Sequence, residues 1–218
     1  MQSNRDPEDP DYVLERIDWS STDSILSEEP SRFVYDYKGR LFGADLVNDE
    51  DNVVFGEIDV CFVDSGRALN EGEPLFDVMD CHSSELEELF CVIHGEGDGI
   101  LEYAEEIYRR WPNLDPFGLL HIRRVVVAPK YRGFGIGLDA MQAAMERFGG
   151  AAALAALKAF PLQCEGVGAP GYAKRIADLG LGQFSPNLDI SQTKLMVHYS
   201  ELGFVPVGST GFMLMPSG

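Results

Sequence analysis

Alternating apolar and polar positions predict strands in three segments of the chain. Residues 31–38, SRFVYDYK, alternate, and residues 52–64, NVVFGEIDVCFVD, add the Val, Ile and Phe that favour strands. Residues 118–127, GLLHIRRVVV, give a strong strand signal. Two shorter strands are predicted near the end of the chain, at 204–207 and 211–215.

Apolar residues spaced by three and four positions predict helices between these strands. One helix covers 85–93, where Ser83 or Ser84 can cap the first turn and Glu87 completes a capping box after Ser84. A second covers 99–111, GILEYAEEIYRRW, and Pro112 ends it.

Two further helices are predicted later in the chain. The helix at 135–148 is ended by a pair of glycines, and the helix at 189–202 runs from a capping Asp189 to Gly203. Between them, residues 161–188 are rich in Gly and Pro and predict a long loop with one short helix.

Residues 151–160, AAALAALKAF, fit two structures when taken alone. Alanine favours a helix, whereas ten residues between a glycine pair and Pro161 also fit a buried parallel strand. The chain shows no internal repeat. We expect residues 1–10 to be a disordered N-terminal tail and residues 11–218 to be a single domain.

The charge of the chain excludes some classes of partner. Its 17 basic and 36 acidic residues give a formal net charge of −19, which repels nucleic acids and anionic membranes. The same charge either makes a solvated acidic surface or draws in a cationic substrate. The polar N-terminus lacks the features of a signal peptide, and no apolar run is long enough to span a bilayer, so we expect a cytoplasmic protein.

The cysteines and histidines give little support to a metal site. Cys81, His82, Cys91 and His94 are irregularly spaced and include no CxxC pair, so a zinc site is disfavoured and we expect no metal. The spacing of the four cysteines also shows no disulfide framework.

The most informative segment is 125–138, VVVAPKYRGFGIGL, in which a strand leads through glycines into a helix. Glycines allow a ligand to approach the backbone closely, and the free N–H groups at a helix start bind phosphate. A Walker loop would need GK[ST] after the glycines, and a dinucleotide site would need GxGxxG with an acid about 20 residues on. Neither is present, which leaves a coenzyme A site or a tight turn with no ligand.

Two blocks of sequence resemble the GNAT superfamily of acyl-CoA-dependent N-acyltransferases. The run V-x-P-x-Y-R-G-x-G-I-G that begins at Val127 is similar to its acetyl-CoA signature, and Tyr199-Ser-Glu-Leu-Gly-Phe is similar to its closing Y-x-x-x-G-F block. The close resemblance covers about residues 119–215. The residues before it fit the family only in general layout.

The resemblance implies an α/β (α+β) fold with a mixed, mostly antiparallel central sheet flanked by helices. The sheet would splay between the strand that ends at Val127 and the strand at 151–160, and acetyl-CoA would lie in the opening. The implied cofactor-binding residues are Val125, Val126, Val127, Arg132, Gly133, Phe134, Gly135, Ile136, Gly137 and Leu138.

Two candidate catalytic residues follow from the motifs. By resemblance, Tyr199 is the general acid that protonates the departing thiolate, although a packed helical tyrosine is the alternative. Strand alternation places His121 on one face with Leu119, Arg123 and Val125, where an imidazole could take the proton of an amine. A buried structural histidine is the alternative for His121.

The sequence departs from the family pattern at two positions. Many members carry an Asn seven residues before the tyrosine, where this chain has Gln192, and many carry a carboxylate near the start of the strand that here reads Leu119-Leu120-His121. The acceptor therefore cannot be transferred by analogy.

We expect an N-acetyltransferase that moves an acetyl or short acyl group from acyl-CoA to a small-molecule or peptide amine. No cysteine lies in either motif, which favours direct transfer over a covalent enzyme intermediate. The alternative is a noncatalytic acyl-CoA-binding or regulatory domain on the same fold. Nucleic-acid and membrane partners are not expected, and a homodimer is left open.

Overall fold

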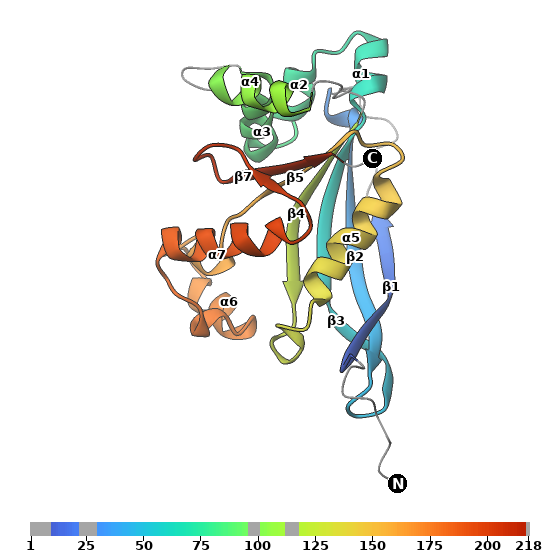
Figure 1. Cartoon of the computed structure of the whole chain (residues 1–218), viewed down its shortest axis with the longest axis vertical. Coiled ribbons are helices and arrows are strands. Elements are labelled where there is room, and N and C mark those ends of the chain that lie inside the picture. The colour runs from blue at the N-terminus through green and yellow to red at the C-terminus, as the bar shows by residue number, and fades with distance from the viewer. Residues whose placement is uncertain (1–9, 22–29, 96–100, 112–117, 217–218) are drawn as a thin grey trace.

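The computed structural model describes residues 10–21, 30–95, 101–111 and 118–216. Across these residues the strands form one mixed sheet of seven, in the order β1-β2-β3-β4-β5-β7-β6 (Figure 1). The strands are β1 (Tyr12–Ser21), β2 (Val34–Asp45), β3 (Glu50–Val63), β4 (Leu119–Val127), β5 (Leu154–Lys158), β6 (Val205–Pro206) and β7 (Phe212–Pro216). The described helices are α1 (Ser65–Glu71), α2 (Leu75–Asp80), α3 (Ser84–His94), α4 (Leu101–Arg110), α5 (Ile136–Phe148), α6 (Tyr172–Asp178) and α7 (Leu188–Ser200).

Two hydrophobic clusters pack on opposite faces of the sheet. One cluster joins helices α1 to α4 to β3, β5 and the start of β4, and its members include Leu89, Leu119 and Ala156. The other joins α5 to the other face, and its members include Ile122 and Met141. Figure 1 shows α1 to α4 gathered at one end of the sheet and α5 crossing the strands. These two clusters define an α3 face and an α5 face for β4.

The expected fold class is confirmed: the sheet is mixed, mostly antiparallel and flanked by helices. Its parallel pair is β4 with β5, which match from Leu119↔Leu154 to Ile122↔Leu157. Beyond Ile122, β4 continues to Val127 and pairs there with β3. The two parallel strands therefore open into a V, at the place where the sequence predicted a splay.

Most of the expected elements are present. Residues 151–160 contain a strand and not a helix, and the helices expected around 85–93, 135–148 and 189–202 all form. The helix expected at 99–111 is described from Leu101 onward. The tail expected at 1–10 falls almost wholly outside the described residues. No helix among the described residues is long and apolar enough to cross a membrane.

Three elements were missed. Strand β1, YVLERIDWSS, pairs only with β2, and the charged residues of this edge strand obscure its alternation. Helices α1 and α2 are only seven and six residues long, and the sequence pattern predicted no helix at either place. Such short helices carry too few turns for a periodic signal.

The cap of α7 was assigned to the wrong residue. The side chain of Asn187 accepts a hydrogen bond from the Ile190 backbone N–H at 3.0 Å, and Asp189 lies in the first turn. At α3 the cap is Ser83, whose hydroxyl accepts from Leu86 N–H at 3.3 Å, so Glu87 is one residue too far along for a capping box with Ser83.

A β-bulge in β4 overturns the predicted alternation. Asp59 pairs with Arg124 and Val60 with Ile122, which leaves Arg123 as an extra residue. Leu119 and His121 therefore face α3, whereas Val125 packs on the α5 face with Ile122. Strict alternation had placed Val125 on the same face as His121.

Gly118 allows β4 and β5 to start side by side. Its φ is +92°, its carbonyl accepts from Ala153 N–H at 2.9 Å, and an added Cβ would lie 1.9 Å from the Ala151 carbonyl oxygen. We expect Gly118→Ala to lower the free energy of unfolding by about 3 kcal/mol or more. This corresponds to a fall of roughly 6–12 °C in Tm.

The matched control is Gly150→Ala, because an added Cβ there meets no atom within 4 Å. Its melting curve should overlay that of the wild type. Equal Tm values for Gly118→Ala and the wild type would show that the close approach to Ala151 does not constrain the fold.

Candidate functional site

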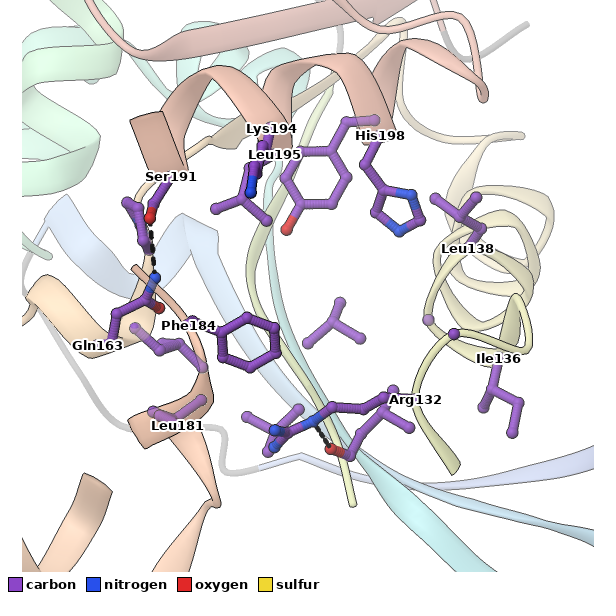
Figure 2. Close-up of a pocket in the computed structure, with 18 of the residues that line it drawn as sticks. Arg132, Ile136, Leu138, Gln163, Leu181, Phe184, Ser191, Lys194, Leu195 and His198 are labelled. Atoms are coloured by element: carbon purple, nitrogen blue, oxygen red, sulfur yellow. Dashed lines mark hydrogen bonds between the residues drawn. The ribbon is translucent and has the colours of Figure 1, made fainter. Parts of the chain in front are cut away.

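The opening between β4 and β5 is part of a cleft of about 700 Å³ (Figure 2). One wall is the exposed end of β4, and a second is the first turn of α5 with the glycines before it. The inner face of α7 and the two ends of the segment 161–188 complete the cleft. A cleft of this size, bounded by one open strand edge and one helix start, suits an elongated ligand with an anionic end.

The glycine turn presents a bare helix N-terminus to the cleft. Gly133 and Gly135 have φ values of +84° and +81°, and an added Cβ at either position meets no atom within 4 Å. Gly135 is the N-cap of α5 and supplies no side chain to its first N–H groups. These groups lie at the positive end of the helix dipole, so the turn is fit to hold a phosphate or pyrophosphate.

The unpaired edge of β4 supplies backbone groups to the same cleft. Val125, Val126 and Val127 all line it. The Val127 carbonyl accepts a hydrogen bond from Arg132 Nε at 2.8 Å, drawn as the dashed line beside Arg132 in Figure 2. An extended amide-bearing chain can pair with such an edge as an added strand would.

The Arg132 side chain donates hydrogen bonds to backbone carbonyls of the protein itself. Besides Val127, its guanidinium donates to the carbonyls of Gly180 at 3.1 Å and Leu179 at 2.5 Å. Burial lowers the pKa of Arg132, but the group remains charged at neutral pH. Arg132 lines the cleft as expected, and its three bonds tie the glycine turn to the segment 161–188.

A second arginine link crosses the open end of the V. Arg124, in β4, donates to both carboxylate oxygens of Glu165 at 2.7 and 2.8 Å. Arg175, in α6, also contacts the Glu165 carboxylate, at 3.1 Å, and its carbonyl. The segment 161–188, predicted as a long loop with one short helix, contains the short helix α6. It is linked to β4 through Arg124 and to the glycine turn through Arg132.

Tyr199 lies on the face of α7 that lines the cleft. Burial raises the pKa of its phenol, so the hydroxyl stays protonated at neutral pH. Among the described residues this hydroxyl has no hydrogen-bond partner. A protonated and unengaged hydroxyl in the cleft is available to donate a proton to a ligand.

Part of this arrangement falls within a match to a known family. The model of the acetyltransferase (GNAT) family matches residues 70–161, which contain β4, the glycine turn, α5 and β5. Residues 70–161 are a GNAT acetyltransferase domain. Comparisons with curated proteins and with solved structures found no significant match. The GNAT family uses acetyl-CoA as cosubstrate, so the domain supports acyl-CoA-dependent acyl transfer in general. The block around Tyr199 lies outside the matched residues.

Most of the expected cofactor residues lie together in the cleft. Val125 to Val127, Arg132, Gly133 and Gly135 to Leu138 all line the cleft, together with Tyr199. Phe134 does not line the cleft. Its ring packs edge-on against the ring of Tyr12, with 4.6 Å between the ring centroids. Gln192, where many GNAT members carry Asn, also does not line the cleft.

Several lining residues had not been singled out from the sequence. On α7, Ser191, Lys194, Leu195 and His198 share a face with Tyr199, as their three- and four-residue spacing dictates. That spacing would have identified them once Tyr199 was chosen. Gln163, Leu181 and Phe184 could not be found in this way, because only the fold brings the segment 161–188 to the cleft.

His121 lies apart from the cleft, on the α3 face of β4. Its side chain is completely buried, and its Nε2 is 3.4 Å from Glu85 Oε1. No group of three or more His, Cys, Asp or Glu side chains in the described part of the chain is placed to hold a metal ion.

The three bonds of Arg132 generate a prediction. Lysine has one ammonium in place of a planar fork and cannot reach three separate carbonyls. We expect Arg132→Lys to loosen the segment 161–188, so that trypsin cleaves after Lys174 or Arg175 at least about tenfold faster, since each lost bond to a charged group contributes about 1.5–3 kcal/mol.

Arg109→Lys is the matched control, because Arg109 is exposed in the last turn of α4 and does not line the cleft. Its digestion should follow the wild-type time course. If Arg132→Lys is digested at the wild-type rate, Arg132 does not hold the segment in place.

Proposed function

We propose that the protein is an N-acetyltransferase that transfers an acetyl or short acyl group from acyl-CoA directly to an amine. The observation that carries the proposal is the convergence of three features on one cleft: the unpaired edge of β4, the bare N-terminus of α5 and the Tyr199 hydroxyl. Each feature suits a different part of the same cosubstrate.

Different cleft residues would bind different parts of acetyl-CoA. The N–H groups at Gly135 to Gly137 would hold the pyrophosphate. The backbone of Val125 to Val127 would pair with the amides of the pantetheine arm, and this pairing requires a strand edge that β5 does not occupy. The thioester would then lie where β4 and β5 part, beside the end of the Ile122↔Leu157 pairing.

Transfer needs one proton to be given and one to be taken. A neutral amine attacks the thioester carbon and then loses a proton to solvent, a backbone N–H of β4 stabilises the oxyanion, and Tyr199 protonates the leaving sulfur as the carbon–sulfur bond breaks. Its raised pKa suits this role, because the phenol remains protonated until the thiolate develops.

A screen of primary amines tests the reaction class. Lysine, spermidine, phenethylamine and a peptide with a free N-terminus are each incubated with acetyl-CoA, and the released thiol is measured. Amine-dependent thiol release supports the proposal. Tight acetyl-CoA binding without transfer to any of these amines would support the noncatalytic binding domain instead.

The glycine turn can be tested by binding alone. Gly135→Val places a branched side chain over the N–H groups of α5, so we expect acetyl-CoA affinity to fall at least tenfold, or by about 1.4 kcal/mol, in calorimetry. The fold should be retained, because the added Cβ meets no protein atom within 4 Å.

A positive φ by itself strains valine, and the control separates this strain from the loss of the ligand site. Gly168 has a φ of +83° and equally open surroundings but does not line the cleft. Gly168→Val should share the loss of stability and bind acetyl-CoA like the wild type. Equal binding by both variants would place the phosphates elsewhere.

Tyr199→Phe removes the proposed acid and keeps the ring. We expect turnover to fall about 100-fold with little change in acetyl-CoA affinity, because the hydroxyl is needed when sulfur leaves and not when the thioester binds. The free energy of unfolding should change by no more than about 1 kcal/mol.

Tyr35→Phe is the control for loss of a tyrosine hydroxyl. The Tyr35 hydroxyl accepts a hydrogen bond from Arg67 at 2.8 Å, outside the residues that line the cleft. Its turnover should equal that of the wild type. A folded Tyr199→Phe protein with wild-type turnover would remove Tyr199 from the mechanism.

A further inference from the structure

Acetyl-CoA carries more phosphate than the glycine turn can hold. It has a pyrophosphate and, beyond it, a phosphate monoester on the ribose of its adenosine. The bare start of α5 suits one such group, because a helix N-terminus offers only the few N–H groups of its first turn. The chain has a formal net charge of −19, which repels any further phosphate. The ribose phosphate therefore needs a cation of its own in the cleft.

The arginines nearest to the glycine turn are already engaged. Arg132 comes directly before the turn, but its guanidinium donates to three backbone carbonyls. Binding a phosphate would break the bonds that hold the segment 161–188 against the turn. Arg123 and Arg124, in β4, do not line the cleft, and each is paired with a carboxylate.

Two further basic side chains line the cleft, and both come from α7. Lys194 and His198 are one turn apart on its inner face. Within the described parts of the chain, Lys194 makes no hydrogen bond or ion pair. Figure 2 shows both side chains pointing from α7 into the cleft, with His198 on the side of Leu138 in the first turn of α5.

The exposure of the α7 side chains separates the rim of the cleft from its interior. Lys194 and His198 are exposed, whereas Leu195 and Tyr199, on the same helix, are half-buried. The proposed binding mode places the pantetheine arm along β4, between the pyrophosphate and the interior. The ribose leaves the pyrophosphate in the other direction, toward solvent, where Lys194 and His198 lie.

We propose that Lys194 and His198 form a second phosphate site at the rim of the cleft, for the ribose phosphate of acetyl-CoA. The proposal rests on the proposed binding of acetyl-CoA at the glycine turn. The ammonium of Lys194 has three donors on a flexible stem, which suits a phosphate monoester. A protonated His198 adds an N–H donor from Nε2. The site distinguishes acetyl-CoA from acyl carriers that lack this phosphate.

Glu201 is the one carboxylate among the described residues that line the cleft. Its Oε1 is 3.5 Å from His198 Nδ1, so Nε2 is the ring nitrogen left to face a ligand. The Glu201 side chain is 62% exposed, so solvent screens its repulsion of a phosphate. Lys194 is two turns away, about 10 Å along the helix axis. The carboxylate therefore does not neutralise the ammonium.

The experiment compares two ligands that differ only in this phosphate. Calorimetry with the full chain measures the Kd of acetyl-CoA and of dephospho-acetyl-CoA, which lacks the ribose phosphate. We expect the wild type to bind acetyl-CoA at least about tenfold more tightly, because the phosphate makes charge-assisted hydrogen bonds. Equal Kd values for the two ligands would overturn the proposal.

Two substitutions assign the preference to α7. Lys194→Met removes the charge and keeps an unbranched stem, so we expect acetyl-CoA affinity to fall at least about fivefold and dephospho-acetyl-CoA affinity to change less than about twofold. His198→Gln should act in the same direction by a smaller factor. Equal losses for the two ligands in Lys194→Met would overturn the proposal, because the ammonium would then not act on the ribose phosphate.

Lys174→Met is the matched control, because it makes the same charge change at an exposed lysine that does not line the cleft. Both of its Kd values should equal those of the wild type. If Lys174→Met weakens acetyl-CoA binding as much as Lys194→Met does, net charge accounts for the effect and the site is overturned.

The failures of the two proposals are distinguishable. A wild type that binds neither ligand overturns the proposed function and the second phosphate site together. If the wild type binds both ligands equally and Gly135→Val weakens both, the cofactor site at the glycine turn stands and only the second phosphate site fails.

Discussion

The loss of pairing between β4 and β5 after Ile122↔Leu157 is the constraint on which the site depends. A strand edge inside a sheet normally has its backbone groups satisfied by the next strand. Here β5 does not pair with the edge at Val125 to Val127, and the protein must hold the two strands apart without filling the gap. The packing of α5 across β4, where a Cβ on Gly137 would lie 3.6 Å from Val127 Cγ2, supports the edge from one face.

Most of the basic side chains around the opening bind other parts of the protein and so help to hold the strands apart. The chain has only 17 basic residues, yet Arg124, Arg132, Arg175 and Lys158 all bind partners across the opening or beside it. Farther along, Lys130 donates to the buried Asp45 at 2.8 Å, and this bond lowers the pKa of Asp45. Cations near the cleft are therefore largely engaged with carboxylates and carbonyls.

The sequence predicted the parts of the site that depend on local pattern. The run from Val125 to Leu138 identifies a strand, a glycine turn and a helix start, because each has a local signature in Val, Gly and helical spacing. It could not predict that Val125 lies on the opposite face from His121, because the bulge at Arg123 shifts the register by one residue and has no sequence signal. Nor could it place Gln163 or Phe184, since long-range arginine bonds bring their segment to the cleft.

The same bulge gives the opening two chemically different sides. Without it, the alternation of β4 would carry His121 and Val125 to one face of the sheet. With it, the edge at Val125 to Val127 and Tyr199 lie toward α5, and His121 with Glu85 lies toward α3. A single extra residue in one strand thus keeps the buried imidazole away from the cleft.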